Sequence, residues 1–322
     1  MDILLLYVDD MVITVDDLEG ITALKLHLSS CFEMKDLGLL RYFLGIEVEK
    51  SSDGYFISQV KYASDILQRD GLTDSKTADT PLELNVKLNP FEGKALANHT
   101  LYRQLVGSLN YLTITRPNIS HAVHVVSQFM SAPRSTHYAV VLRILRYIKG
   151  TLYQGIKFSS TSDLCLHAYS DSDWAGDITY RRSTTGYCVF LGNSLISWRS
   201  NKQSIVSRSS AEAEYRALAH TTSEIVWLRW LLEDMGVHLS EPTPLCCDNK
   251  AAIRIAHNDV FHERRKHIEI DCHFVRHHFK QQTIVLPFVR SKLQLADLFT
   301  KTLTSARLRF LISKLNMCVA LS

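Results

Sequence analysis

The sequence lacks any apolar run close to the roughly 20 residues that a membrane helix needs. It also lacks a recognisable signal peptide, and an expected first strand begins almost directly after Met1. We therefore expect no membrane partner and an intracellular protein. The seven cysteines contain no C-x-x-C pair, so we expect reduced thiols in the protein core. Two of them, Cys246 and Cys247, are adjacent in an expected strand and should point to opposite faces.

The chain also has little net charge, because 36 Lys and Arg residues nearly balance 33 Asp and Glu residues. The net charge of +3 is too small to indicate a nucleic-acid partner, although basic residues cluster at 263–266 and 276–280. Hydrophobic residues make up 46% of the 322 positions and charged residues 21%, which is typical of a globular chain of two or three domains. Disorder is therefore not expected.

The N-terminal region predicts a hairpin that carries two acids at its tip. Tyr7-Val8-Asp9-Asp10 lies between the apolar runs Ile3 to Leu6 and Met11 to Ile13. Two adjacent carboxylates repel each other unless a cation lies on them, so a metal-binding turn and an ordinary acidic turn both remain open at this point.

The first half of the chain then predicts short strands and several helices. Residues 73–100 are rich in Thr, Asp, Asn and Pro and predict an extended connector. The expected elements are a helix at 18–31, strands at 39–48 and 54–58, a helix at 59–71, and helices at 102–114, 119–130 and 136–148.

From residue 164 onward the pattern predicts a mixed sheet flanked by helices, an α/β arrangement. The expected strands are 164–170, 186–191, 195–198, 244–247 and 284–289. The expected helices are 210–235, 249–257, 267–279 and one that starts near 295.

Four acids occupy positions that can meet at one edge of this sheet. Asp171 ends the first strand, Asp248 follows the fourth, and Asp297 begins the last helix. Glu214 lies on the sheet-facing stripe of the long helix, where an unpaired carboxylate is costly, whereas Glu212 fits a helix-capping box. Each Asp taken alone fits a cap or turn, but together they predict a site of oxygen ligands, which favours magnesium or manganese.

A series of motifs resembles the ribonuclease H domain of copia-type retrotransposon Pol polyproteins. The motifs are Ala168-Tyr-Ser-Asp-Ser-Asp-Trp-Ala-Gly-Asp177, Arg182-Ser-Thr-Thr-Gly186, Ser197-Trp198, Lys202-Gln203, Ser210-Ala-Glu-Ala-Glu-Tyr215, Cys247-Asp-Asn249, Lys266-His-Ile-Glu-Ile270 and Gln294-Leu-Ala-Asp-Leu-Phe-Thr-Lys301. The N-terminal Tyr7-Val8-Asp9-Asp10 and Tyr42-Phe-Leu-Gly-Ile-Glu47 resemble the reverse transcriptase of the same polyproteins.

The resemblance implies four regions. Residues 1–72 correspond to the end of the reverse transcriptase palm with the start of the thumb, and 73–160 to a linker and a helical thumb or connection region. Residues 161–305 correspond to a ribonuclease H-like domain with a mixed five-stranded sheet, and 306–322 to a C-terminal tail.

The resemblance also implies an activity, namely cleavage of the RNA strand of an RNA–DNA hybrid with two magnesium or manganese ions. Asp171, Glu214, Asp248 and Asp297 correspond to the metal-binding acids, and Asp173 and Asp177 are lower-ranked rivals for the first. We expect a hybrid or duplex to be held through phosphates and ribose hydroxyls. The candidates for these contacts are Arg181, Arg182, Lys202, Gln203 and Asn249.

Two histidine features modify this expectation. Many relatives in the wider ribonuclease H group have a histidine before the last helix, but residues 289–294 contain none, so turnover is expected to be slow. His273 and His277 are spaced to share a zinc ion but lack a third ligand, so we favour helix-surface histidines there.

The polymerase remnant is expected to be incomplete, because the chain begins after the other palm carboxylate and the fingers. Asp9 and Asp10 then bind metal without completing a site, and DNA synthesis needs the missing N-terminal portion. A non-catalytic remnant that binds duplexes, and a longer natural chain, are the alternatives. The resemblance suggests cytoplasmic virus-like particles or the nucleus as the location, and it leaves the oligomeric state open.

Overall fold

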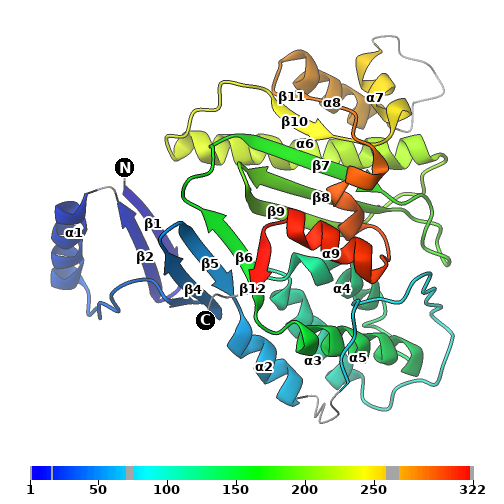
Figure 1. Ribbon diagram of the computed structural model, residues 1–322, viewed down its shortest axis with the longest axis horizontal. Helices are drawn as coiled ribbons and strands as arrows, with labels where there is room; N and C mark the ends of the chain where they lie inside the picture. The colour runs from blue at the N-terminus through cyan, green and yellow to red at the C-terminus, as the bar shows by residue number, and fades with distance from the viewer. Residues whose placement is uncertain (1, 16, 70–75, 259–267, 320–322) are drawn as a thin grey trace.

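Within the described residues, the strands form three sheets (Figure 1). The computed structural model describes residues 2–15, 17–69, 76–258 and 268–319. Helices pack around two of the sheets, so the mixed α/β class predicted from the sequence is confirmed.

The central sheet has the strand order β11-β10-β7-β8-β9. Its strands are β7 (Leu166–Ser172), β8 (Thr184–Leu191), β9 (Ser194–Lys202), β10 (Thr243–Cys246) and β11 (Ile284–Val285). β7, β10 and β11 run parallel to one another, whereas β8 and β9 form an antiparallel meander on β7. This is the mixed five-stranded sheet that the resemblance to ribonuclease H implied.

Both faces of the central sheet are covered at β8, where every residue but the last is buried. Tyr187 and Val189 of β8 belong to one core, together with the long helix α6 (Ser210–Asp234). Cys188 and Phe190 of the same strand belong to the other core. The sheet is therefore a wall between two hydrophobic cores.

Helices cover the two faces of this wall. On the first face, α7 (Lys250–His257) and α8 (Glu269–Lys280) pack with α6. The second core contains α3 (His99–Leu112), α4 (Ser120–Ser127) and α5 (Ser135–Gly150), and α4 lies against β9. The short 3-10 helix η1 (Pro117–Ile119) precedes α4.

A second, antiparallel sheet brings the two halves of the chain together. Its order is β12-β6-β5-β4-β3, from β3 (Tyr42–Phe43), β4 (Ile46–Ser51), β5 (Gly54–Ser58), β6 (Gln154–Ser159) and β12 (Met317–Val319). The helix α2 (Val60–Arg69) follows β5. Its N-terminus is capped by Glu47, whose carboxylate accepts hydrogen bonds from the backbone of Val60 (3.0 Å) and Lys61 (3.1 Å).

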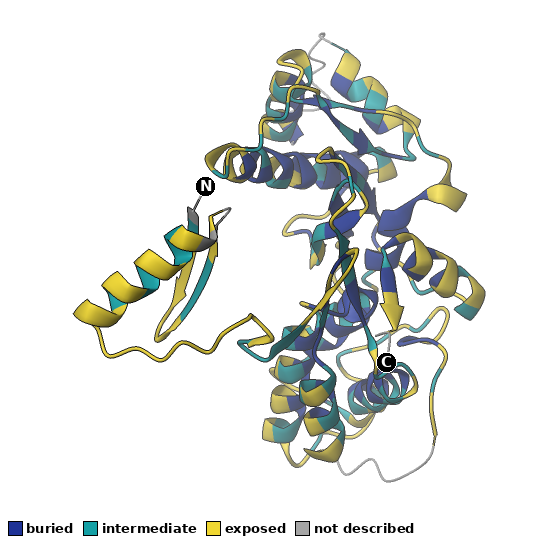
Figure 2. Ribbon diagram, turned by 60° about the vertical axis from the view of Figure 1, so that its left-hand side comes forward, coloured by how far each residue is buried: buried dark blue, intermediate teal, exposed yellow. Residues whose placement is uncertain are grey.

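The N-terminal hairpin is a largely exposed part of the fold. β1 (Asp2–Tyr7) pairs with β2 (Asp10–Val15), and α1 (Leu18–Cys31) follows them. Figure 2 shows this unit standing off from the rest of the chain, with much of its surface exposed. Leu6 is 61% exposed and Val8 77%. The hairpin and the helix at 18–31 agree with the sequence prediction.

Several expected elements differ from the structure. The strand expected at 39–48 is broken, because Leu44 and Gly45 adopt φ values of 49° and 78° and turn the chain between β3 and β4. The Tyr111 hydroxyl donates a hydrogen bond to the Leu44 carbonyl and holds this turn. The expected strand at 284–289 is short, and β6 within the expected helical region was missed.

The C-terminal part of the chain also differs in detail. The helix expected from 295 is a 3-10 helix, η4 (Leu295–Phe299), preceded by another, η3 (Ser291–Leu293). The stretch expected to be a tail contains the helix α9 (Ser305–Lys314) and β12. The start of the helix expected at 267 lies outside the described residues. The positions of the domain boundaries stay a prediction.

The cysteines are free thiols, but not all of them lie in the core. Cys188, Cys247 and Cys272 are buried, Cys246 is half-buried, and the remaining three are exposed: Cys31, Cys165 and Cys318. The expectation of core thiols is therefore wrong for those three. In the described part of the chain, no helix is both long enough and apolar enough to cross a membrane.

One buried cation stabilises the helical region. Arg116 is 1% exposed, and burial lowers the pKa of its guanidinium to about 10. It donates hydrogen bonds to the Thr151 carbonyl (3.0 Å) and to Asn118 Oδ1 (3.3 Å). The connection after α3 is thus joined to the end of α5.

We predict that Arg116→Ala lowers the free energy of unfolding by about 3 kcal/mol, because it removes hydrogen bonds to a charged group and leaves a cavity. Urea denaturation followed by circular dichroism measures the loss. The matched control is Arg103→Ala, since Arg103 is exposed and donates to the Met130 carbonyl. Equal effects of the two substitutions would contradict a structural role for Arg116.

Candidate metal centre

The parallel pairing of β7 and β10 brings two acids to one rim of the central sheet. Leu245 lies opposite Ala168, and Cys246 lies opposite Tyr169. Asp171 and Asp248 each lie two residues beyond this last pair, so both reach the same carboxyl end of the sheet. The burial of Asp171, which is 1% exposed, follows from its place inside the wall between the two cores.

Lys301 joins Asp171 to a third acid, Asp297 of η4. Its Nζ atom lies 3.1 Å from Asp171 Oδ1 and 2.6 Å from Asp297 Oδ1. Burial lowers the pKa of Lys301, but the two carboxylates outweigh this effect and raise it. The Thr300 hydroxyl donates to the other oxygen of Asp171. Asp171 and Asp297 are therefore partly neutralised by a cation of the protein itself.

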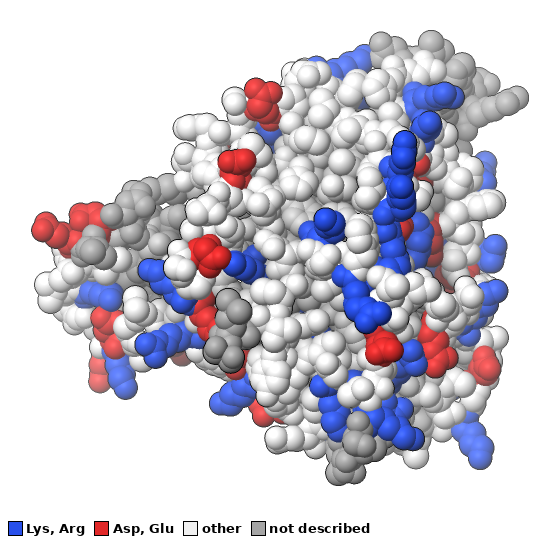
Figure 3. All heavy atoms as spheres, viewed as in Figure 1, with Lys and Arg blue, Asp and Glu red and all other residues white. Residues whose placement is uncertain are grey.

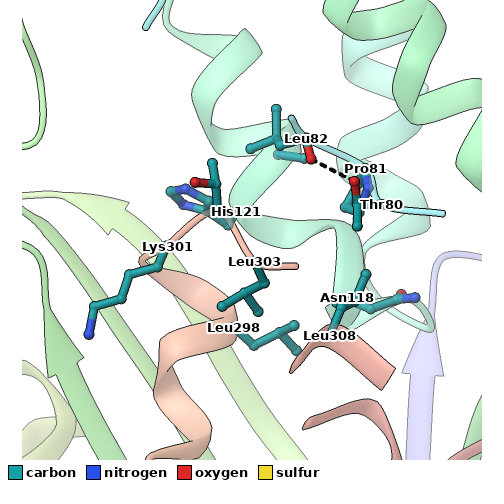
Figure 4. A pocket seen from close by; sticks show the side chains of 11 residues that line it. Thr80, Pro81, Leu82, Asn118, His121, Leu298, Lys301, Leu303 and Leu308 are labelled. Atoms are coloured by element: carbon teal, nitrogen blue, oxygen red, sulfur yellow. Dashed lines mark hydrogen bonds between the residues drawn. The ribbon is translucent and has the colours of Figure 1, made fainter. Parts of the chain in front are cut away.

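The Lys301 side chain also borders a small cavity beside α4. The cavity measures about 20 Å³ and is lined by His121, Leu298 and Leu308 among others. A volume of that size holds about one water molecule. In Figure 4 the Lys301 ammonium points away from these residues. The cavity is thus too small for a ligand larger than water. The ammonium of Lys301 forms ion pairs with Asp171 and Asp297 instead of pointing into the cavity.

Arg307 of α9 fixes the other side of Asp297. Its Nη2 lies 2.9 Å from Asp297 Oδ2, and it also donates to the backbone carbonyls of Ser291 (3.0 Å) and Gln294 (3.2 Å). Ser291 in turn donates a hydrogen bond of 2.6 Å to Asp248 Oδ2. The segment η3–η4 therefore connects Asp248 and Asp297 and holds both at the rim.

Glu214 completes the cluster from the second turn of α6. It is 6% exposed, and its Oε2 atom has no hydrogen-bond partner. Burial, reinforced by the charges of Asp171 and Asp248, raises the Glu214 pKa to about 9, although Lys301 and the Ser172 backbone oppose the shift. Burial raises the Asp171 pKa as well. The rim thus has a deficit of positive charge on the side of Glu214.

A divalent cation fits this deficit. Carboxylate oxygens of Glu214 and Asp248 and the Cys247 sulfur lie within 4.8 Å of one another. The orphaned oxygen of Glu214 is the buried acceptor that a hard cation such as magnesium satisfies. The structure therefore places Asp171, Glu214, Asp248 and Asp297 at one rim, and their role as metal ligands stays a prediction.

The two rivals of Asp171 have other contacts. Asp177 accepts hydrogen bonds from the backbone of Thr179 and Tyr180 (3.1 Å each) and pairs with Lys202 at 2.5 Å. Asp173 accepts a hydrogen bond from the Thr184 backbone, and burial raises its pKa to about 6. Of the three, Asp171 is the one that pairs with Lys301 beside Asp297, and its rank above the two rivals stays a prediction.

The predicted nucleic-acid contacts fall into two groups. Arg181 and Arg182 are exposed, and Lys202 lies 5.4 Å from the centre of the Tyr180 ring, where it also pairs with Asp177. Gln203 is instead buried, with its amide donating to Thr185 Oγ1 (3.1 Å) and to the Ala213 carbonyl (2.9 Å). Gln203 therefore joins β9 to α6, and its amide is not presented to a ligand.

Asn249 has a capping role. Its side-chain oxygen accepts hydrogen bonds from the backbone of Ala251 and Ala252 at the start of α7 (3.0 Å each). The two backbone N–H groups occupy the side-chain oxygen of Asn249, which lies next to Asp248 in the chain. A further contact with nucleic acid stays a prediction for Asn249, as for the two arginines and Lys202.

The remaining candidates lie away from this rim. Asp9 and Asp10 are exposed at the tip of the N-terminal hairpin, where Val8 adopts a φ of 51°. His273 and His277 are exposed on α8. Among the described residues, neither pair belongs to a close group of three metal-binding side chains. The preference for helix-surface histidines over a zinc site thus agrees with their placement.

The sequence did not predict the residues that form hydrogen bonds and ion pairs with the acids. Thr300 and Lys301 were part of a recognised motif, but no role was assigned to them. The i, i+4 spacing of Asp297 and Lys301 was the available signal for their ion pair. Arg307, Ser291 and Cys247 gave no comparable signal, because their contacts depend on how η3 and α9 fold back.

The comparisons with known proteins agree with the motifs. A family described as Reverse transcriptase (RNA-dependent DNA polymerase) matches residues 2–84. The chain is 43% identical over 314 residues to the retrovirus-related Pol polyprotein from transposon RE1 of Arabidopsis thaliana, a match that covers 98% of this chain and 21% of that protein. An uncharacterized mitochondrial protein of the same plant is 46% identical over 224 residues, which cover 70% of this chain and 93% of that protein.

The chain belongs to the copia-type retrotransposon Pol family. It spans about one fifth of the length of the RE1 Pol polyprotein. Among solved structures, LC11-RNase H1 in complex with RNA/DNA hybrid is similar at 12% identity, with a TM-score of 0.32 over 42% of this chain and 93% of that one.

The raised pKa of Glu214 makes a pH-dependent prediction. A carboxyl whose folded pKa exceeds its unfolded value near 4.3 favours folding below that value, and the contribution is lost as pH rises toward about 9. Without divalent ions, Glu214→Gln should therefore stabilise the fold at pH 8 by about 1–4 kcal/mol and have little effect at pH 4. Urea denaturation in EDTA at both pH values measures this difference.

The matched control for this prediction is Glu212→Gln. Glu212 accepts a 2.8 Å hydrogen bond from the Arg208 backbone and pairs with Arg216 at 3.0 Å, so neutralising it should destabilise the fold at pH 8. A Glu214→Gln protein no more stable than the parent at pH 8 would show that the Glu214 carboxyl is not strained.

Proposed function

We propose that the chain is a metal-dependent nuclease that cuts the RNA strand of an RNA–DNA hybrid. One observation supports the proposal most directly: four carboxylates from four separate segments meet at one sheet rim, and Glu214 has an unpartnered buried oxygen there. Membership of the Pol family agrees with a nucleic-acid substrate.

The residues at the rim would have different roles in metal binding. Glu214 and Asp248, with Asp171 beside them, would hold a magnesium or manganese ion through oxygen ligands. When bound, two such ions roughly 4 Å apart activate a water molecule and stabilise the leaving oxygen of a phosphodiester. Ser291 orients Asp248 through its hydrogen bond, and Arg307 fixes Asp297. These two residues position ligands rather than react.

Lys301 would affect which carboxylates are open to a cation. Its ammonium lies between Asp171 and Asp297 and already balances part of their charge. The Lys301 side chain is 42% exposed, so it has room to move toward solvent. Glu214 and Asp248 are therefore the acids that would hold a cation without displacing Lys301, whereas Asp297 would hold one only if Lys301 moved.

Exposed basic residues flank the acids and suit a phosphate backbone. Arg290 and Lys292 lie in the segment before η4, and Arg309 and Lys314 lie on α9. Figure 3 shows Lys and Arg side chains gathered over this part of the surface, close to acidic ones. Together with Arg181 and Arg182, such groups would hold phosphates without reading base sequence, whereas ribose 2′-hydroxyls would distinguish RNA from DNA.

A non-catalytic duplex-binding remnant is the second candidate. One observation favours it: Lys301 and Arg307 pair with Asp171 and Asp297, so cations of the protein itself balance part of the charge at the rim. Such a protein would bind a hybrid and leave it intact at saturating magnesium.

We predict magnesium-dependent cleavage of a labelled RNA strand in a hybrid, and slow turnover because residues 289–294 hold no histidine. Asp248→Asn should lower the single-turnover rate at least about a hundredfold, since metal-ion stabilisation of the transition state is worth several kcal/mol. Gel analysis of the end-labelled strand gives the rate. EDTA should abolish cleavage.

The control is Asp163→Asn, because Asp163 is exposed in the loop before β7. It should cleave at the parental rate. Cleavage at equal rates by the Asp248→Asn and parental proteins would point to a contaminating nuclease, and hybrid binding without cleavage would favour the remnant.

We also predict that this chain alone adds no nucleotides to a primed template. Asp9 and Asp10 sit on an exposed two-stranded hairpin, and no third donor in the described residues closes a metal site around them. Primer extension with labelled deoxynucleotides tests this, with a complete reverse transcriptase as positive control. Extension that Asp9→Asn abolishes would contradict the prediction.

A further inference from the structure

A buried thiol lies among the carboxylates of the metal centre. Cys247 is fully buried, and its sulfur belongs to the same group of three donors as Glu214 and Asp248, with all ligand atoms within 4.8 Å of one another. The nuclease chemistry proposed above uses oxygen ligands only and gives this sulfur no part. It therefore needs its own explanation.

The position of Cys247 is fixed by the sheet. Its backbone N–H donates to the Pro287 carbonyl (3.2 Å), and its carbonyl accepts from the Val289 N–H (3.0 Å). The sulfur accepts a hydrogen bond of 3.3 Å from the Asn249 N–H. A backbone donor on sulfur favours the thiolate over the thiol, as a metal-bound sulfur requires.

A metal ion would bind this sulfur as the thiolate. The thiol proton would leave to the solvent as the sulfur–metal bond forms.

The three donors differ from those of a magnesium site because one of them is sulfur, which is a softer ligand than oxygen. Magnesium prefers oxygen and is poorly served by sulfur, whereas zinc takes Cys sulfur at about 2.3 Å and carboxylate oxygen at about 2.0–2.2 Å. Both carboxylate oxygens of Asp171 already accept hydrogen bonds, from Lys301 and from Thr300. A zinc ion held by Glu214, Cys247 and Asp248 would therefore take water as its fourth ligand.

We propose that Glu214, Cys247 and Asp248 form a site for a thiophilic divalent cation of the zinc class. Because Glu214 and Asp248 are shared, this cation and magnesium exclude each other, and zinc holds the centre in an inactive state. Only this exclusion rests on the nuclease proposal. The binding of the thiophilic cation is independent of it.

Cadmium tests the site, because a cadmium–thiolate bond has a charge-transfer band in the ultraviolet. Titration of the full chain with cadmium, with the exposed Cys31, Cys165 and Cys318 replaced by serine in every variant, should give a saturable band. Cys247→Ser should lose this band and bind at least about tenfold more weakly, since even loss of an outer partner of a metal ligand costs about 10–100-fold in affinity.

The chain offers a close control in Cys246→Ser. Cys246 is the adjacent residue, and its thiol lies near Tyr169 and Cys188 rather than Glu214. This variant should keep the saturable band. A band that is absent from the parental protein, or that survives in Cys247→Ser, would overturn the proposal.

A second substitution guards against misfolding of Cys247→Ser. Glu214→Gln keeps every remaining thiol and should weaken cadmium binding at least about tenfold by the same reasoning. Unchanged affinity in Glu214→Gln would overturn the assigned ligand set.

Competition separates this inference from the nuclease proposal. Excess magnesium should shift the cadmium titration to higher concentration, and no shift would overturn the mutual exclusion. A Cys247-dependent band in a protein that cuts no hybrid would support the thiophilic site while the nuclease proposal failed.

Discussion

Buried negative charge at the rim of the central sheet is the constraint on which the site depends. Asp171, Glu214 and Asp297 are each less than a tenth exposed, and several carboxylates in a low-dielectric region repel one another strongly. On one side of the cluster, the side chains of Lys301 and Arg307 form ion pairs with Asp297 and reduce this repulsion. On the other side, no cation among the described residues pairs with Glu214, and the proposal of a bound metal ion rests on this asymmetry.

The sheet can carry this charge because it is held on both faces. One core contains α6 and the helices beside it, and the other contains α3, α4, α5 and α9. Contacts such as the 3.1 Å hydrogen bond from Trp198 Nε1 to the Thr113 carbonyl tie the sheet to the second core. A rigid frame of this kind keeps the acids close together despite their repulsion.

The sequence predicted the elements with strong periodicity and the acids that follow strands. The helix at 18–31 and the long α6 were correctly predicted, because strand ends and helix faces can be identified locally. The four acids lie at one rim of the sheet, and their binding of metal stays a prediction. Lys301, Arg307 and Cys247 were missed, since their roles arise from contacts between segments far apart in the chain. The break at Leu44–Gly45 was missed for a similar reason, because Tyr111 of α3 supplies the hydrogen bond.

The pairing of β12 with β6 has a consequence for the independence of the parts. Residues 317–319 complete a sheet whose other strands come from residues 42–58 and 154–159. The outer face of β8 is covered by helices that precede it in the chain, as the burial of Cys188 and Phe190 shows. Residues 161–305 excised by themselves would therefore expose a broad apolar surface, so we expect the two sides of the central sheet to fold as one cooperative unit.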